Sequence, residues 1–458
     1  MCGITGVYCD GGSLASNYVY YSLFSLQHRG QESAGIASFE KVVRLRKGMG
    51  LVSEVIKSDD LRYLRGKVAI GHVRYSTTGN SSLENAQPFV VKSKVGYIAV
   101  AHNGNLVNHE NLRAYLENLG NVFSSDSDSE VIAQLFSRYM MHLDLLDALK
   151  KMTEVLIGSY SIVALINDKL VAFRDPLGFR PLCVGEISDG YIIASESCAI
   201  DAVEGKFIKD LDPGEVAIIE NGDIEFVKVV ETKRRATCVF EYIYFARPDS
   251  VIDGVSVYAA RKAMGEELAK ESPVYADAVS AVPDSGITAA IGYAAASKIP
   301  YIESLIKNRY VGRTFIMPKK ELRELSVKLK INTVRENVFG KRLILVDDSI
   351  VRGTTSRRIV QMLRNAGALE IHLRIASPPI VAPCYFGIDM KTREELIAAN
   401  HDLKEIAEFL TADSVCYLSL DGLKRALKRC GRGEGYCLAC LTSLYPVPVP
   451  GEKCIVDS

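Results

Sequence analysis

Residues 343–356 constrain the fold more than any other stretch of this 458-residue chain. An apolar run leads into two adjacent carboxylates, Asp347 and Asp348, and a short turn then leads into a helical pattern from about residue 357. A buried strand followed at once by a turn and a helix is typical of a parallel α/β sheet, in which ligands bind beyond the carboxyl ends of the strands. The sequence therefore predicts that both aspartates lie at such a strand end.

The turn itself indicates the ligand. Its residues before and into the helix are Arg352, Gly353, Thr354, Thr355 and Ser356. Backbone N–H groups and hydroxyls at a helix N-terminus suit a phosphate, and carboxylates suit ribose hydroxyls or hydrated Mg²⁺. This combination resembles the binding loop of type I phosphoribosyltransferases, whose substrate is phosphoribosyl pyrophosphate (PRPP). An ordinary strand–turn–helix with solvated acids is the alternative, which the ordered set of chemical groups disfavours.

Composition excludes several classes of protein. Lysine plus arginine total 55, as do aspartate plus glutamate, so net charge does not indicate binding to nucleic acid or to a membrane surface. The start of the chain lacks the pattern of a signal peptide, and no stretch approaches the ~18 apolar residues of a membrane helix. We therefore expect a cytoplasmic protein with neither a nucleic-acid partner nor a membrane partner.

The first half of the chain predicts an α+β domain over residues 1–230. Strands are expected at 2–8, 33–39, 67–73, 96–101, 160–166 and 191–195. Helices are expected at 15–26, 110–119 and 129–141. Many strands with few helices indicate stacked layers.

The second half, residues 231–458, has a different pattern in which strands and helices alternate. Strands are expected at 277–282, 300–305, 342–346 and 369–375. This alternation predicts a doubly wound α/β domain with a mainly parallel sheet. Residues 231–270 are expected to connect the two halves, and residues 420–458 to form a cysteine-bearing tail.

Cys2 is a candidate nucleophile. If Met1 is removed, the α-amine of Cys2 lies within reach of its own thiol, and an α-amine with an ordinary pKa of ~7.7–8.0 can accept the thiol proton at neutral pH. One residue would then supply both nucleophile and base. Many proteins carry a residue without a special role at position 2, so the interpretation of Cys2 as a nucleophile depends on other residues.

Three further segments support the catalytic interpretation. Arg74 ends a strand pattern, where its guanidinium could bind a carboxylate through two N–H groups. Asn103 and Gly104 lie at the end of another predicted strand, where the Asn103 side chain and the Gly104 N–H could form an oxyanion hole. Asp128 offers an anion for an ammonium group. Together these residues would hold an amino acid at both ends while its side-chain amide is attacked. Considered separately, Arg74 could form a structural ion pair, the segment at Asn103 a hairpin turn, and Asp128 a helix cap.

This conjunction resembles the N-terminal-nucleophile (Ntn) glutamine amidotransferases, whose early His-Arg-Gly-x-Glu-Ser/Asp-x-Gly segment matches residues 28–35. The resemblance implies an Ntn hydrolase domain with αββα layers, in which Cys2 hydrolyses glutamine. A glutaminase joined to a PRPP domain resembles the amidophosphoribosyltransferase family over nearly the whole chain, including residues 240–249 and 307–318. That family implies passage of ammonia to PRPP through a shielded route, giving 5-phosphoribosylamine, pyrophosphate and glutamate in the first committed step of purine synthesis.

The family resemblance also implies roles in the second domain. The aspartate pair would bind ribose or Mg²⁺, and the following turn would hold the 5-phosphate. Ser285 would contribute to the metal and pyrophosphate region, although relatives often carry a second hydroxyl residue after it. Arg309 and Arg313 would act in a basic loop that closes on pyrophosphate. The family further suggests a homotetramer or homodimer and inhibition by purine nucleotides.

The eleven cysteines need an explanation other than disulfides, which are rare in the cytosol. Cys437 and Cys440 form a Cys-x2-Cys pair suited to one metal centre, and Cys238 and Cys384 could complete four ligands. In the iron–sulfur subclass of the family these positions hold a [4Fe-4S] cluster. A structural Zn²⁺ would accept the same four thiolates, and Cys430 is a rival ligand.

Two other functions stay open at this point. A related amidotransferase could deliver ammonia to a hexose phosphate or to aspartate, but should lack the loop at residues 343–356. A PRPP-sensing regulator without activity would keep that loop and lose the glutaminase residues. The sequence contains both sets. Relatives with the cluster commonly carry a short propeptide before the nucleophilic cysteine, whereas Cys2 here directly follows Met1.

Overall fold

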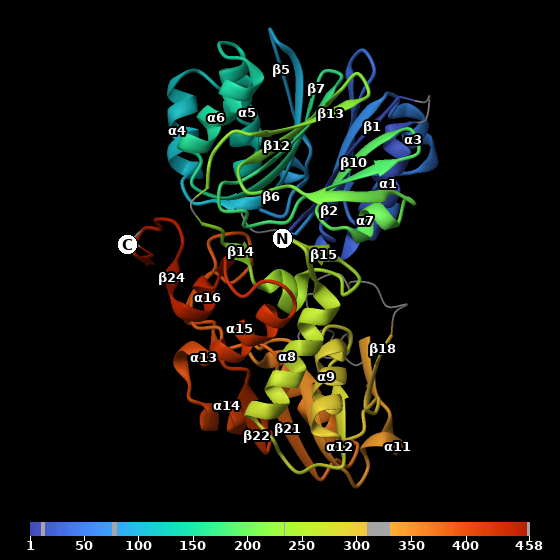
Figure 1. Ribbon diagram of the computed structural model, residues 1–458, viewed down its shortest axis with the longest axis vertical. Helices are drawn as coiled ribbons and strands as arrows, with labels where there is room; N and C mark the ends of the chain where they lie inside the picture. The colour runs from blue at the N-terminus through green and yellow to red at the C-terminus, as the bar shows by residue number, and fades with distance from the viewer. Residues whose placement is uncertain (11–13, 76–79, 233, 309–329, 456–458) are drawn as a thin grey trace.

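The computed structural model describes residues 1–10, 14–75, 80–232, 234–308 and 330–455. The chain forms two units joined end to end, and the N-terminus lies where they meet (Figure 1). Within the described residues, no helix is long and apolar enough to cross a membrane.

The first unit contains two stacked antiparallel sheets. The seven-stranded sheet has the order β11-β9-β10-β1-β4-β2-β3, and its strands are β1 (Gly3–Cys9), β2 (Ser33–Phe39), β3 (Val43–Met49), β4 (Val68–Arg74), β9 (Cys183–Ile187), β10 (Gly190–Ala194) and β11 (Lys206–Asp210). The six-stranded sheet has the order β13-β12-β8-β7-β6-β5, and its strands are β5 (Phe89–Ser93), β6 (Gly96–Leu106), β7 (Gly158–Ile166), β8 (Lys169–Arg174), β12 (Glu215–Glu220) and β13 (Asp223–Lys228).

Helices cover the outer faces of both sheets (Figure 1). The seven-stranded sheet packs against α1 (Ala15–Ser25), with α2 (Val52–Val55), α3 (Ser58–Tyr63), α7 (Cys198–Asp201) and the short turn η1 (Gln27–Arg29) nearby. The six-stranded sheet packs against α4 (His109–Asn118), α5 (Asp128–Met140) and α6 (Leu145–Val155), with the turn η2 (Leu83–Asn85) beside it. The predicted layered α+β domain is confirmed.

The inner faces of the two sheets pack closely. Their shared core includes Ile4 from one sheet and Val163 from the other. A methyl group added at Gly6 would lie only 2.5 Å from Cγ1 of Val163 and 2.8 Å from Cδ1 of Leu170. Glycine at position 6 therefore lets β1 approach the opposite sheet, and this approach fixes the position of the residues that precede β1.

The second unit is built on a four-stranded parallel sheet with the order β17-β20-β21-β22. β20 (Arg342–Asp347) pairs with both of its neighbours and is buried from Leu343 onwards. The other strands are β17 (Ala278–Ala281), β21 (Glu370–Ile375) and β22 (Ser414–Tyr417). The main helices are α8 (Val257–Glu271), α9 (Ile287–Ser297), α12 (Thr354–Asn365), α14 (Leu403–Leu410) and α15 (Leu420–Arg429).

Shorter elements complete this unit. They are β14 (Thr237–Cys238), the π-helical turn η3 (Glu241–Phe245), β15 (Val251–Ile252), β16 (Val255–Ser256), β18 (Leu305–Lys307), β19 (Ile331–Thr333), α11 (Arg335–Val338), α13 (Ile397–Asn400), β23 (Tyr436–Cys437), α16 (Ala439–Thr442), β24 (Leu444–Tyr445) and β25 (Lys453–Cys454). The predicted parallel α/β sheet is confirmed.

The strand expected at residues 300–305 is wrong for most of its length. Only an isolated parallel bridge joins Tyr301 to Val279, and β18 begins at Leu305. Pro300 has no N–H to donate, and Ser304 turns its N–H and hydroxyl to the side chain of Ser280 instead of to a strand. The segment therefore follows β17 for one bridge and then leaves the sheet.

A buried charge cluster joins the two units. The Arg29 guanidinium of η1 forms two 2.9 Å hydrogen bonds with the Glu241 carboxylate of η3 and a 2.5 Å bond with Glu196. All three side chains are fully buried. Burial alone would raise the pKa of Glu196, but the charges of His28 and Arg29 hold that pKa well below its ordinary value. The carboxylate therefore stays ionised and the pair stays charged.

Removing Glu241 should destabilise the protein strongly. In Glu241→Ala the buried Arg29 keeps Glu196 as its one acidic partner among the described residues, so we expect the free energy of unfolding to fall by about 3 kcal/mol. Urea denaturation followed by circular dichroism measures this loss. The control is Lys151→Ala, which removes an exposed pair with Glu154 and should cost about 0–1 kcal/mol. Equal losses in the two variants would contradict the importance of the buried cluster.

Candidate active sites

Cys2 lies at the end of the first unit that faces the second. Its backbone N–H donates to Oδ1 of Asn103 on β6 over 3.1 Å, and its backbone carbonyl accepts from Nε of Arg29 over 2.9 Å. Its thiol donates to the carbonyl of Tyr75 over 3.6 Å. The main chain of this residue is thus held on both sides, and the two stacked sheets each contribute to the position of the thiol.

Asn103 has a buried donor that no described group satisfies. Its side-chain Nδ2 is enclosed and has no hydrogen-bond partner in the described part of the chain. At the next position, a Cβ on Gly104 would lie 2.0 Å from the Ser159 carbonyl oxygen and 2.7 Å from Nε2 of His102. Only glycine fits there. Buried donors are nearly always paired, so an unpaired amide beside a thiol suits an oxyanion.

The structure brings Arg74 close to Cys2. Arg74 ends β4, whose residue Val73 lies opposite Gly3 of β1. The guanidinium is buried, pairs with the carboxylate of Glu32, and donates to the carbonyl of Asn80 over 3.2 Å. It is therefore an ion-paired side chain held in a fixed orientation at the end of the sheet.

Asp128 reaches the same region from the other sheet. It is the first residue of α5, and its carboxylate accepts the Leu106 N–H over 3.0 Å and the Ser129 hydroxyl over 3.3 Å. Leu106 ends β6, the strand that also carries Asn103. All five residues predicted for the glutamine site are therefore positioned by β1, β4, β6 and α5 at one end of the stacked sheets.

Sequence reasoning assigned no role to the residues that connect this end to the second unit. Arg29 lies in a segment that matched the glutaminase pattern, yet its partner Glu241 is 212 positions away and follows no spacing rule. The second unit also contributes two carbonyl groups: Tyr385 accepts from Nδ2 of Asn105 over 2.9 Å, and Phe386 accepts from the Ser159 hydroxyl over 2.8 Å. These hydrogen bonds hold the second unit against β6 and β7.

The second candidate site lies at the carboxyl end of β20. Asp347 and Asp348 are buried, and neither forms an ion pair within the described residues. Burial, and then the charge of Asp348, raise the pKa of the Asp347 carboxyl well above its ordinary value. The Asp348 N–H donates to Oδ1 of Asp347 over 2.9 Å. Two buried carboxylates without a pairing cation fit a divalent ion whose other ligands come from phosphate and water.

The predicted phosphate turn closes over the same strand end. Gly353 has φ +74 directly before α12, and a Cβ there would lie 2.9 Å from Cδ1 of Ile397. Thr354, Thr355 and Ser356 form the first turn of α12. The guanidinium of Arg352, directly before this turn, pairs with the carboxylate of Glu395. The first turn of this helix therefore faces the strand end with hydroxyls and backbone N–H groups.

Ser285 also lies near the aspartates. It belongs to the turn between β17 and α9, and the next residue, Gly286, has no room for a Cβ, which would lie 2.6 Å from the Val346 carbonyl oxygen and 3.3 Å from Cα of Asp347. Ser285 is partly exposed beside this close approach. Arg309 and Arg313 lie outside the described residues.

The four predicted cysteine ligands gather where the units meet. Cys238 on β14 pairs in parallel register with Cys437 on β23. Electrostatic interactions connect Cys238, Cys384, Cys437 and Cys440 with one another. Cys430 interacts with other neighbouring side chains instead. Burial raises the pKa of the Cys238 thiol to about 11, so without a metal this thiol is protonated at neutral pH.

The two units and their residues define a class of protein, a glutamine amidotransferase fused to a phosphoribosyltransferase. The family model for the glutamine amidotransferase domain matches residues 72–202. The amidophosphoribosyltransferase of Archaeoglobus fulgidus is 66% identical over 99% of this chain and 100% of its own length. That of Methanocaldococcus jannaschii is 52% identical, with 99% of both chains covered.

A solved structure supports the same assignment. The glutamine PRPP amidotransferase from Bacillus subtilis, complexed with ADP and GMP, is 47% identical, superposes with a TM-score of 0.91, and matches 98% of both chains. The chain therefore belongs to the amidophosphoribosyltransferase family. It catalyses the first committed step of purine biosynthesis from glutamine and PRPP, and its two units have the Ntn and phosphoribosyltransferase folds that the sequence predicts.

The unpaired donor of Asn103 generates a prediction. Asn103→Asp keeps the Oδ1 acceptor for the Cys2 N–H and removes the Nδ2 donor. We expect glutamine hydrolysis to slow about 10²–10³-fold, the usual effect of losing one oxyanion donor. Steady-state assays with glutamine, and in parallel with added ammonium salt, measure the effect. Loss of ammonia-dependent synthesis to the same extent would show that the substitution acts on the whole protein.

Proposed function

We propose that Cys2 is the nucleophile that releases ammonia from glutamine, and that the ammonia displaces pyrophosphate from PRPP at the end of β20. The observation that carries this proposal is the enclosed Nδ2 donor of Asn103 beside the Cys2 main chain. The domains are proposed to span residues 1–230 and 231–458, in agreement with β13 ending at Lys228 and β14 beginning at Thr237.

The base for the first step is proposed to be the α-amine of Cys2, freed by removal of Met1. The ordinary pKa of an α-amine is ~7.7–8.0, so at neutral pH part of it is unprotonated and can accept the thiol proton. The thiolate then attacks the amide carbon of glutamine, and the oxyanion accepts hydrogen bonds from Nδ2 of Asn103 and the N–H of Gly104.

Collapse of this intermediate gives a thioester on Cys2 and expels ammonia, which takes up the proton held by the α-amine. Water then releases glutamate. Arg74 is proposed to bind the α-carboxylate of glutamine and Asp128 its α-ammonium group. A route shielded from solvent is required between the two sites, because ammonia that reaches water is protonated and lost as a nucleophile.

In the second site Asp347, Asp348 and Ser285 are proposed to hold Mg²⁺ and the ribose, and the first turn of α12 to hold the 5-phosphate. Bound Mg²⁺ supplies charge neutralisation for the departing pyrophosphate. Arg309 and Arg313 are proposed to contact pyrophosphate. Ammonia attacks ribose C1 while the C1–O bond to pyrophosphate breaks, and the ammonium product loses one proton to give 5-phosphoribosylamine.

The four gathered cysteines are proposed to bind a [4Fe-4S] cluster with a structural role. Four thiolates suit such a cluster, and the resemblance to the iron–sulfur subclass favours it over a structural Zn²⁺, which is the alternative and would accept the same four thiolates. All eleven cysteines are free, and this supports the proposed cytoplasmic location.

Regulation and assembly are further proposals. The related Bacillus subtilis enzyme was solved with ADP and GMP, which supports inhibition of this enzyme by purine nucleotides. A homotetramer or homodimer is proposed from the family resemblance.

Replacing the proposed nucleophile tests the function. Cys2→Ala should abolish glutamine-dependent synthesis, because it removes the attacking sulfur, while synthesis from added ammonia continues. The measurement is PRPP-dependent pyrophosphate release with each nitrogen source. Unchanged use of glutamine would refute the proposed role of Cys2.

The metal proposal has its own matched pair of variants. Anaerobically purified protein should contain about four iron and four sulfide per chain, the composition of one [4Fe-4S] cluster. Cys437→Ser should lose most of both, and Cys430→Ser should retain them. Stoichiometric zinc with little iron would identify the alternative metal, and equal losses in the two variants would reject the assigned ligand set.

A further inference from the structure

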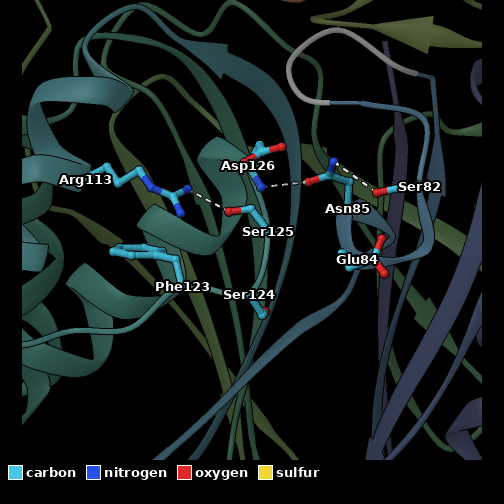
Figure 2. Close-up of a pocket in the computed structure, with 8 residues that line it drawn as sticks. All are labelled: Ser82, Glu84, Asn85, Arg113, Phe123, Ser124, Ser125 and Asp126. Atoms are coloured by element: carbon cyan, nitrogen blue, oxygen red, sulfur yellow. Dashed lines mark hydrogen bonds between the residues drawn. The ribbon is translucent and has the colours of Figure 1, made fainter.

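Asn85 is a buried amide that bridges two segments of the glutamine half. It ends the short turn η2 and is 1% exposed. Figure 2 shows its side chain at a cavity of about 230 Å³, between Ser82 on its own turn and Asp126 on the opposite wall. Every polar atom of this side chain has a hydrogen-bond partner, and the partners belong to different parts of the chain.

The amide nitrogen of Asn85 reaches the segment next to Arg74. Nδ2 of Asn85 donates to the carbonyl oxygen of Asn80 over 2.9 Å. The same oxygen accepts a 3.2 Å hydrogen bond from Nη1 of Arg74. One carbonyl group thus joins the Asn85 side chain to the guanidinium, so a shift of Asn85 moves one of the acceptors that hold Arg74, another being the Glu32 carboxylate.

The amide oxygen of Asn85 reaches the segment before Asp128. Oδ1 accepts from the backbone N–H of Asp126 over 3.1 Å, as Figure 2 shows. Asp126 stands two residues before Asp128, and between them Ser127 caps α5 by accepting the Ser129 N–H. The bond from Asn85 therefore fixes the chain where it enters the helix that presents the Asp128 carboxylate.

We propose that Asn85 is a positioning residue that sets the spacing between Arg74 and Asp128. It thereby makes hydrolysis depend on both the α-carboxylate and the α-ammonium group of glutamine. The inference rests on the proposed binding roles of these two residues. The geometry requires an amide: a donor must face the Asn80 carbonyl oxygen while an acceptor faces the Asp126 N–H, and a carboxylate or a hydrocarbon supplies at most one of these.

Two variants separate the two bonds. Asn85→Asp keeps an acceptor for the Asp126 N–H but places an acceptor against the Asn80 carbonyl oxygen, so it breaks only the connection to Arg74. Asn85→Ala breaks both connections. Asn121→Asp is the control, since it makes the same chemical change in the same unit at a side chain that donates to Gln134.

The assay compares three substrates for hydrolysis: glutamine, its α-carboxamide, and 4-carbamoylbutanoate, which lacks the α-amine. In Asn85→Asp we expect the preference for glutamine over the α-carboxamide to fall about tenfold, consistent with loss of one hydrogen bond between a displaced Arg74 guanidinium and the substrate carboxylate. Its preference over 4-carbamoylbutanoate should stay unchanged. Asn85→Ala should lose both preferences, and Asn121→Asp neither. Ammonia-dependent synthesis should be unchanged in all three.

Two results would overturn the inference. One is retention of both preferences in the Asn85 variants; the other is a parallel loss of ammonia-dependent synthesis, which would mark Asn85 as a general structural residue. Arg74→Lys and Asp128→Asn separate this failure from failure of the proposed function. If these two variants lose substrate preference while the Asn85 variants keep it, only the positioning role of Asn85 is wrong. If Arg74→Lys and Asp128→Asn also keep substrate preference, the proposed binding roles of Arg74 and Asp128 are wrong.

Discussion

The buried pair between Arg29 and Glu241 is the interaction on which the arrangement of the enzyme depends. Its two partners come from different units, and Arg29 also holds the carbonyl of Cys2. A charged pair removed from water tolerates little displacement, because either partner alone would be a buried charge without compensation. The orientation of Cys2, the proposed nucleophile, is therefore tied to the docking of the second unit.

Further contacts extend from this junction toward the proposed PRPP site at the end of β20. Arg261 on α8 is buried and donates over 2.8 Å each to the carbonyls of Tyr242, within η3, and Ala246, directly after it. Burial lowers the pKa of its guanidinium, and the nearby charge of Asp348 opposes that change. The segment that begins with Glu241 is thus held at one end by Arg29 of the glutaminase half and at the other by Arg261 of the second unit.

The sequence predicted those parts of the fold and of the candidate sites that are formed by residues close together in the chain. The strand, acidic pair and turn at residues 343–356 follow one another along the chain, so their pattern could be recognised directly. The strand expected at 300–305 failed because tertiary contacts of Ser304 replaced pairing that the apolar pattern favoured. Arg29 with Glu241, and Asn85 with Asp126, join distant segments through side chains whose types are common at turns and surfaces, so no spacing could reveal them.

The pairing of β14 with β23 has a consequence for the order of events during protein synthesis. β14 leaves the ribosome soon after the glutaminase unit, but its partner strand and the cysteines beside it are made only after the whole parallel sheet. Domains generally fold as they emerge, so the first unit can fold while this seam is still open. The contact between the glutaminase unit and the second unit therefore forms late, after the chain of both units has been synthesised.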